Sequence, residues 1–144
     1  MRVYLDNCAF NRPFDDQGHT RIRVEAEARL CIQEQIRTGA LELVWSYILD
    51  FENDANPFEE RQVSISGWRP YATLDIEETS DILQRAEAPI ELGLKAKDAL
   101  HLSCALAGAC TYFVTTDDEL LKRGTDGQGL MVVDPTAFVR EMNL

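Results

Sequence analysis

The chain has 144 residues, 45% hydrophobic and 27% charged, which is enough for one domain with a substantial core over residues 1–144. No apolar run approaches the roughly 20 residues of a membrane span, and Met1 and Arg2 lead directly into an apolar segment, so we expect a cytoplasmic protein with no membrane association. The formal net charge of −11 argues against broad electrostatic binding to nucleic acid, because such binding needs a basic surface. It leaves room for a nucleic acid held at one cation-filled site and for a basic protein partner.

Strand-like and helical patterns alternate along the chain, which predicts an α/β fold with a parallel sheet covered on both faces. The expected strands are residues 2–6, 41–45, 71–74, 112–116 and 130–133. The expected helices are residues 20–37, 46–52, 58–68, 77–86, 95–107 and 135–142, with Ser46 as the N-cap of the second helix. Residues 11–18 are rich in turn formers and are expected to be a loop.

Four acidic residues fall at positions that such a sheet would bring together. Asp6 and Asp117 end apolar strands, Asp98 opens a helical pattern, and Glu52 lies early in another. Helix starts and strand ends share one edge of a parallel sheet, where α/β proteins place their sites. Carboxylates at close range repel one another unless a hard divalent cation neutralises them. The pattern therefore predicts a metal site.

Each acid also has an ordinary structural explanation. Asp6 could end a strand as a turn residue, Asp98 could complement a helix dipole, and Asp117 could cap the helix that follows it. Asp50 competes with Glu52 for the cluster, but residues two apart on a helix point roughly 200° apart, so only one of them can face it. The convergence of four acids on one edge of the sheet favours a metal site over four separate structural roles.

A histidine and two lysines lie near these acids in the sequence. His101 lies one turn after Asp98 and is either a metal ligand or a packed, hydrogen-bonded histidine; its apolar surroundings favour the packed role. Lys95 and Lys97 precede Asp98 and either contact a phosphate or are solvated.

The four cysteines have no metal-binding or disulfide spacing. Cys31, Cys104 and Cys110 fall in apolar or small-residue stretches and are expected in the core. Cys8 stands near Asp6, and a structural role is favoured there over redox chemistry.

Four short segments together resemble the motifs of PIN domains, in the same order and over nearly the whole chain. They are Tyr4-Leu5-Asp6-Asn7, Ser46 with Glu52 six residues later, Asp98-Ala99-Leu100-His101-Leu102, and Val114-Thr115-Thr116-Asp117. The resemblance implies a three-layer α/β/α sandwich with a central parallel sheet. It also implies a ribonuclease site that uses Mg²⁺ or Mn²⁺. The acids carried over are Asp6, Glu52, Asp98 and Asp117, with Thr116, Thr115 and Asn7 as candidate helpers.

The resemblance also implies partners. The substrate would be RNA, and many small bacterial PIN domains are toxins of toxin–antitoxin pairs, similar to VapC, that bind an antitoxin protein and commonly form homodimers. The chain departs from the family pattern at one site position, since Cys8 stands where relatives often carry Asn and Asn7 comes one residue earlier.

Other functional classes fit the sequence less well. A haloacid dehalogenase-type phosphatase needs a second Asp where Cys8 stands, and a response-regulator receiver needs adjacent acids where Asp6 and Asn7 stand. The remaining alternative is a catalytically silent PIN-like module that binds RNA or a protein partner. Retention of all four acids favours an enzyme, because buried like charges cost stability unless they hold a metal.

Overall fold

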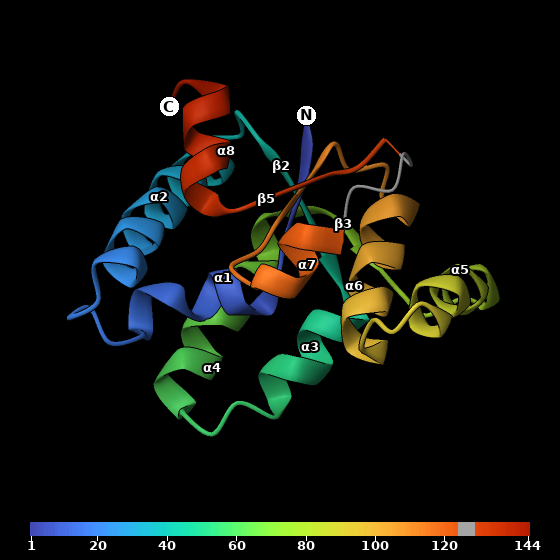
Figure 1. Cartoon of the computed structure of the whole chain (residues 1–144). Helices are drawn as coiled ribbons and strands as arrows, with labels where there is room; N and C mark the ends of the chain where they lie inside the picture. Colours follow the sequence, from blue (N-terminus) through green and yellow to red (C-terminus); the bar gives the residue numbers. More distant parts are fainter. Residues whose placement is uncertain (124–128) are drawn as a thin grey trace.

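A five-stranded sheet, all parallel, forms the centre of the protein (Figure 1). The computed structural model describes residues 1–123 and 129–144. The strands are β1 (Arg2–Leu5), β2 (Glu42–Ser46), β3 (Ala72–Ile76), β4 (Tyr112–Val114) and β5 (Met131–Val133). Their order in the sheet is β3-β2-β1-β4-β5. The predicted α/β class with a central parallel sheet is confirmed.

Helices cover the sheet on both sides. They are α1 (Asn7–Asn11), α2 (Thr20–Arg37), α3 (Tyr47–Asp54), α4 (Glu59–Ser66), α5 (Ser80–Glu91), α6 (Ala96–Ala107), α7 (Asp118–Arg123) and α8 (Pro135–Met142), with short 3-10 turns η1 (Arg12–Phe14) and η2 (Arg69–Tyr71). Helix α2 packs against α8 and α5 packs against α6, and the two pairs lie on opposite sides of the sheet in Figure 1. The three-layer α/β/α architecture is thereby confirmed. Over the two described ranges, no helix is both long and apolar enough to cross a membrane.

The strand order places a topological switch at β1. The chain moves outward from β1 through β2 to β3, then crosses back to β4 on the other side of β1 and continues to β5. Tyr4 is in register with Val44 on β2 and with Phe113 on β4. In such sheets the crevice outside the carboxyl ends of the strands at the switch is where ligands bind. The residues that follow β1 and β4 therefore occupy that crevice.

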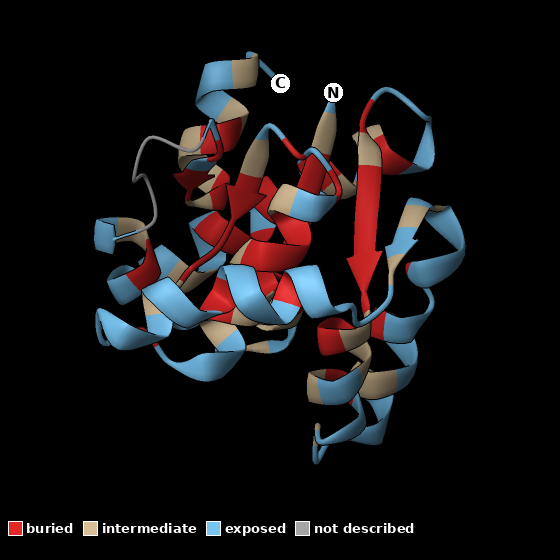
Figure 2. Ribbon diagram, turned by 90° about the vertical axis from the view of Figure 1, so that its right-hand side faces the viewer, coloured by how far each residue is buried: buried red, intermediate tan, exposed pale blue. Residues whose placement is uncertain are grey.

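The central strands of the sheet are buried because helices exclude water from both faces. Val3, Val44, Trp45 and Phe113 are all fully buried, as expected for central parallel strands with near-continuous apolar runs. Figure 2 shows buried strands at the centre and exposed residues along the outer helices. The rigid sheet is thus the support on which the residues at its carboxyl edge are held.

The first crossover differs from the sequence-based expectation. Strand β1 ends at Leu5, and Asp6 is the N-cap of α1, a helix of five residues that was not predicted. A helix of little more than one turn is too short to show helical periodicity in the sequence. Strand β4 likewise ends at Val114, so Thr115 and Thr116 lie beyond the strand.

Two further expectations are corrected in the helical layers. Helix α5 continues to Glu91 instead of ending at residue 86, and Pro89 lies in its last turn, where it removes only one hydrogen bond. Cys31 is exposed on α2, whereas Cys104 and Cys110 are buried as predicted. The exposure of Cys31 was not predicted because apolar and polar residues in α2 are too weakly patterned to show which face of the helix is buried.

Candidate metal centre

Asp6 is held rigidly at the switch point. The residue is only 5% exposed. Oδ1 accepts a hydrogen bond from the backbone N–H of Asn7 at 2.8 Å, and Oδ2 accepts one from the Thr115 hydroxyl at 2.8 Å. The Cys8 thiol donates to Oδ2 at 3.3 Å. These donors fix the orientation of the carboxylate.

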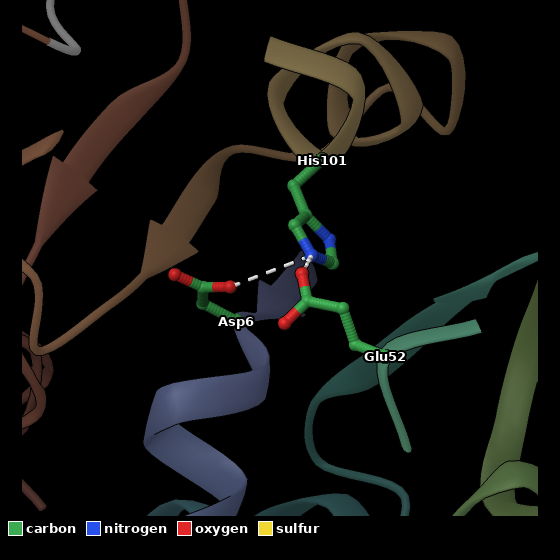
Figure 3. Close-up of side chains that lie close together, drawn as sticks. All are labelled: Asp6, Glu52 and His101. Carbon is green, nitrogen blue, oxygen red and sulfur yellow. Dashed lines mark hydrogen bonds and ion pairs between the residues drawn. The ribbon is translucent and has the colours of Figure 1, made fainter. Parts of the chain in front are cut away.

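Glu52 and His101 bring two further ligand groups beside Asp6 (Figure 3). Nε2 of His101 is hydrogen-bonded to Oε1 of Glu52 and lies 3.7 Å from Oδ1 of Asp6. One ligand atom from each residue lies within 4.8 Å of the other two. We call this group the Asp6–Glu52–His101 cluster. It joins the end of β1, helix α3 and helix α6, so the cluster forms only in the folded sheet.

His101 is anchored from behind by a chain of hydroxyl groups. Its ring is 0% exposed, and Nδ1 lies 2.6 Å from the Tyr4 hydroxyl. The Tyr4 hydroxyl lies 2.6 Å from Oγ of Ser46, which accepts from the backbone N–H of Leu49 at 3.3 Å. Ser46 is therefore the N-cap of α3, as predicted. The chain fixes the imidazole plane relative to both α3 and β1.

Asp98 lies in the first turn of α6 and is half-buried. Burial, followed by the negative charges of Asp6 and Asp117, raises the pKa of Asp98 to about 6, although His101 opposes part of the shift. Glu52 contributes to the same rise in the pKa. The structure thus brings Asp98 within electrostatic reach of the three other predicted acids.

Asp117 caps the start of α7. Its Oδ1 accepts hydrogen bonds from the backbone N–H groups of Glu119 at 2.9 Å and Leu120 at 3.2 Å. The capping role considered from the sequence is therefore present. Asp118 is exposed and pairs with Arg21 at 2.7 Å, away from the cluster. Within the described ranges, Asp98 and Asp117 stand outside the tight Asp6–Glu52–His101 cluster.

The geometry separates Glu52 from its rival Asp50. The indole N–H of Trp45 donates to Oδ1 of Asp50 at 2.9 Å, and Arg69 lies 3.7 Å from its other oxygen. Glu52 instead faces His101. Burial acts to raise the pKa of Glu52, but the hydrogen bond to His101, the charges of His101 and Lys97 and a hydrogen bond from Asn7 together outweigh it, so the pKa is lowered. Glu52 is consequently a carboxylate at neutral pH.

The candidate helper threonines have different contacts. Thr115 is fully buried, bonds Asp6, and accepts from the backbone N–H of Asp117 at 3.1 Å. The backbone N–H of Thr116 donates to Sγ of Cys8 at 3.4 Å. Burial, with the Asp6 charge, raises the pKa of the Cys8 thiol to about 12. Cys8 is therefore a neutral thiol, which is the structural role favoured from the sequence.

The residues present fit a divalent cation. Asn7 follows Asp6, and its side-chain oxygen Oδ1 is buried with no hydrogen-bond partner among residues 1–123 and 129–144. Carboxylate and amide oxygens are ligands for Mg²⁺ and Mn²⁺, and an imidazole nitrogen is compatible with a transition ion. Asp6 and Glu52 would hold such a cation, with Asn7 beside them. A cation would also offset the repulsion between the buried carboxylates.

The signal for His101 as a site residue is weak in the sequence. Its position three residues after Asp98 places both on one helix face, but its apolar neighbours favoured packing alone. In the structure His101 is packed and hydrogen-bonded, as expected. Its Nδ1 contacts the Tyr4 hydroxyl, and its Nε2 faces Asp6 and Glu52. A buried histidine can both pack in the core and face the carboxylates of a site, and the local sequence does not distinguish these roles.

Comparison with known proteins supports the architecture. Neither a protein family nor a curated protein matches this sequence. A chain of VapBC-1 from nontypeable Haemophilus influenzae superposes with a TM-score of 0.61 at 16% identity, over 94% of this chain and 99% of that chain. The chain shares that fold. A chain of VapBC2 from Rickettsia felis, solved bound to a DNA fragment from their promoter, superposes with a TM-score of 0.56 at 14% identity. The match covers 92% of this chain and 97% of that chain.

Proposed function

We propose that the chain is a PIN-type endoribonuclease that hydrolyses RNA phosphodiesters with Mg²⁺ or Mn²⁺. The observation that carries the proposal is the Asp6–Glu52–His101 cluster at the switch of the sheet, with the charges of Asp98 and Asp117 around it. The four PIN-like motifs and the shared fold with the VapBC structures support it.

The residues have separable tasks in this proposal. When bound, a divalent cation would lower the pKa of an attacking water and neutralise charge on the phosphate. Asp6, oriented by Thr115, and Glu52 hold the cation. Asp98, within electrostatic reach of Asp6 and Asp117, accepts the proton of the water. Asp117 contributes negative charge while it caps α7.

An aromatic ring and a lysine beside the site supply contacts for RNA. Phe51, adjacent to Glu52 on α3, is 60% exposed, and Nζ of Lys97 lies 5.8 Å from the centroid of its ring. Bases stack on exposed aromatic side chains in single-stranded nucleic acids, and lysine neutralises phosphate. A short single-stranded segment bound there is compatible with a chain of net charge −11.

Phe51→Ala is expected to raise the KM for single-stranded RNA about tenfold, because one base loses a stacking contact worth roughly 1–3 kcal/mol. The kcat should change little, since Phe51 supplies no acid, base or charged group that acts on the phosphate. The control is Tyr71→Ala, an aromatic ring that is 49% exposed and precedes β3, at the opposite edge of the sheet. Equal KM values for the two variants in steady-state kinetics would contradict the RNA contact.

We further propose that the chain acts with a protein partner, as a toxin with an antitoxin, and that it forms homodimers. The shared fold with chains from VapBC structures supports the protein partner, and the resemblance to PIN domains supports the homodimer. The acidic surface favours a basic polypeptide, whose Lys or Arg would lie near Asp6, Asp98 and Asp117 in place of the cation. Charge complementarity would make the association fast and dependent on salt.

The proposed activity is tested by incubating the purified chain with single-stranded RNA and Mn²⁺ or Mg²⁺, with and without a chelator. We expect endonucleolytic cleavage that the chelator suppresses, because the carboxylates need a cation to act on an anionic phosphate. RNA that is bound yet stays intact with every cation would identify a silent binding module instead. A matched preparation carrying Glu52→Gln controls for contaminating nucleases.

A further inference from the structure

His101 places a ring nitrogen among the oxygens of the Asp6–Glu52–His101 cluster. The ring is fully buried, and Nε2 faces Oε1 of Glu52 and lies 3.7 Å from Oδ1 of Asp6. We propose that His101 is a direct nitrogen ligand of the cation and makes the site select first-row transition ions over Mg²⁺. This inference rests on the proposed function, because it concerns the cation of the same site.

The hydroxyl chain behind His101 allows the ring to become a ligand. Hydroxyl groups both donate and accept, so the Ser46–Tyr4–His101 chain can run in either direction. When Tyr4 donates to Nδ1, the proton of the ring is on Nε2 and is donated to Glu52. When Nδ1–H donates to Tyr4, Nε2 carries a lone pair that can bind a cation. Both states have a neutral ring.

The second state is the arrangement that metal-bound histidines require. A ligating histidine donates its other ring N–H to a fixed acceptor, which sets the tautomer and orients the ring. The Tyr4 hydroxyl, 2.6 Å from Nδ1, is that acceptor. Tyr4 is itself fully buried and stacks on Phe113 with ring centroids 5.2 Å apart, so the acceptor cannot swing away. The nitrogen is therefore aimed at the two carboxylates before a cation arrives.

A nitrogen ligand changes which cation the site prefers. Mg²⁺ demands oxygen ligands in octahedral geometry, whereas affinities of mixed nitrogen and oxygen sites rise from Mn²⁺ to Co²⁺. A site made by Asp6 and Glu52 alone would discriminate poorly among these ions. With Nε2 of His101 added, we expect Co²⁺ to bind more tightly than Mn²⁺ and Mn²⁺ more tightly than Mg²⁺.

Pulsed electron paramagnetic resonance on the Mn²⁺-loaded protein detects the ligand directly. Nitrogen bound to Mn²⁺ gives a ¹⁴N hyperfine coupling, and the chain has only two histidines. The other, His19, is exposed and precedes α2, so His19→Gln serves as the control that keeps the coupling. The coupling in wild type and in His19→Gln is the expected result. Bound Mn²⁺ with no nitrogen coupling would overturn the inference.

Calorimetric titration of His101→Gln measures the selectivity. We expect the ratio of Co²⁺ to Mg²⁺ affinity to fall at least about tenfold, since losing even a partner of a ligand costs about 10–100-fold in metal affinity. Ser103→Ala is the matched control: Ser103 is buried on α6 but donates to the carbonyl of Ile82 at 2.7 Å, outside the cluster. An unchanged ratio in folded His101→Gln contradicts the inference. If that variant does not fold, the resonance measurement on the wild type decides.

The outcomes separate this inference from the proposed nuclease. Cleavage of RNA with bound Mn²⁺ but without nitrogen coupling leaves the nuclease intact and overturns the role of His101. Nitrogen coupling without any RNA cleavage supports the role of His101 and overturns the nuclease. Failure of Mn²⁺, Co²⁺ and Mg²⁺ to bind in the calorimeter overturns both.

Discussion

Glu52→Gln is expected to reduce RNA cleavage at least about 100-fold, the lower end of what a positioned acid–base or ligand carboxylate contributes. The amide keeps the size of the side chain and can still contact His101, but it removes a negative charge from the cluster. Because Glu52 is only partly buried on α3, the fold should persist. Initial rates with saturating Mn²⁺, alongside circular dichroism, measure the effect.

Asp50→Asn is the matched control for this result. Asp50 lies two residues earlier on the same helix, and its carboxylate bonds Trp45 and faces Arg69 instead of the cluster. The variant removes the same charge from the same helix. It therefore tests whether the direction in which the carboxylate faces matters, and not the net charge of the protein. Cleavage should be retained. A loss of similar size in both variants would mean that the cluster is not the reacting site.

Asp98→Asn is expected to stabilise the metal-free protein at pH 7–8, although it should also lose activity. The pKa of Asp98 is raised from 3.8 to about 6, so its ionisation opposes folding. Two pKa units correspond to about 3 kcal/mol, which solvent screening at this half-buried position reduces to about 1–2 kcal/mol. The melting temperature should rise by roughly 3–8 °C.

The pH dependence gives the sign of this effect. Protonated Asp98 is the favoured folded form, so its stabilising contribution is complete below about pH 4 and is lost as the pH rises through about 6. Wild type and Asp98→Asn should therefore melt alike near pH 4, diverge as the pH rises from about 4 to about 6, and differ by a constant amount above that. A difference that is constant from pH 4 to pH 8 would exclude a raised pKa as the cause.

A cation should act on the same repulsion. Millimolar Mn²⁺ should raise the melting temperature of the wild type at pH 7, because a ligand that binds only the folded state stabilises it. The increase should be smaller in Asp98→Asn, which has less negative charge to neutralise. No change in the wild type at saturating Mn²⁺ or Mg²⁺ would show that the acids do not form a working metal site.

The alternation of element types could be read from the sequence. Central parallel strands are apolar on both faces, so the runs around Tyr4, Val44 and Phe113 were visible as strands without knowledge of their partners. The edge on which Asp6 and Asp117 lie followed from chain direction alone, because Asp6 directly follows β1 and Asp117 comes three residues after the end of β4. Strand ends are therefore the part of the site that local sequence determines.

Only the tertiary structure decided which helical residues face that edge. The motif resemblance favours Glu52, but helical periodicity alone does not choose between Asp50 and Glu52. Their difference lies in the rotation of α3, where Ser46 caps the helix and the indole N–H of Trp45 donates to Asp50. The orientation of His101 depends on the Tyr4 hydroxyl, 97 residues away in the chain. Such long-range contacts leave no periodic trace in the sequence, because helix rotation is set by packing against other elements. The membership of His101 in the cluster was therefore determined by the fold and not by its neighbours in the chain.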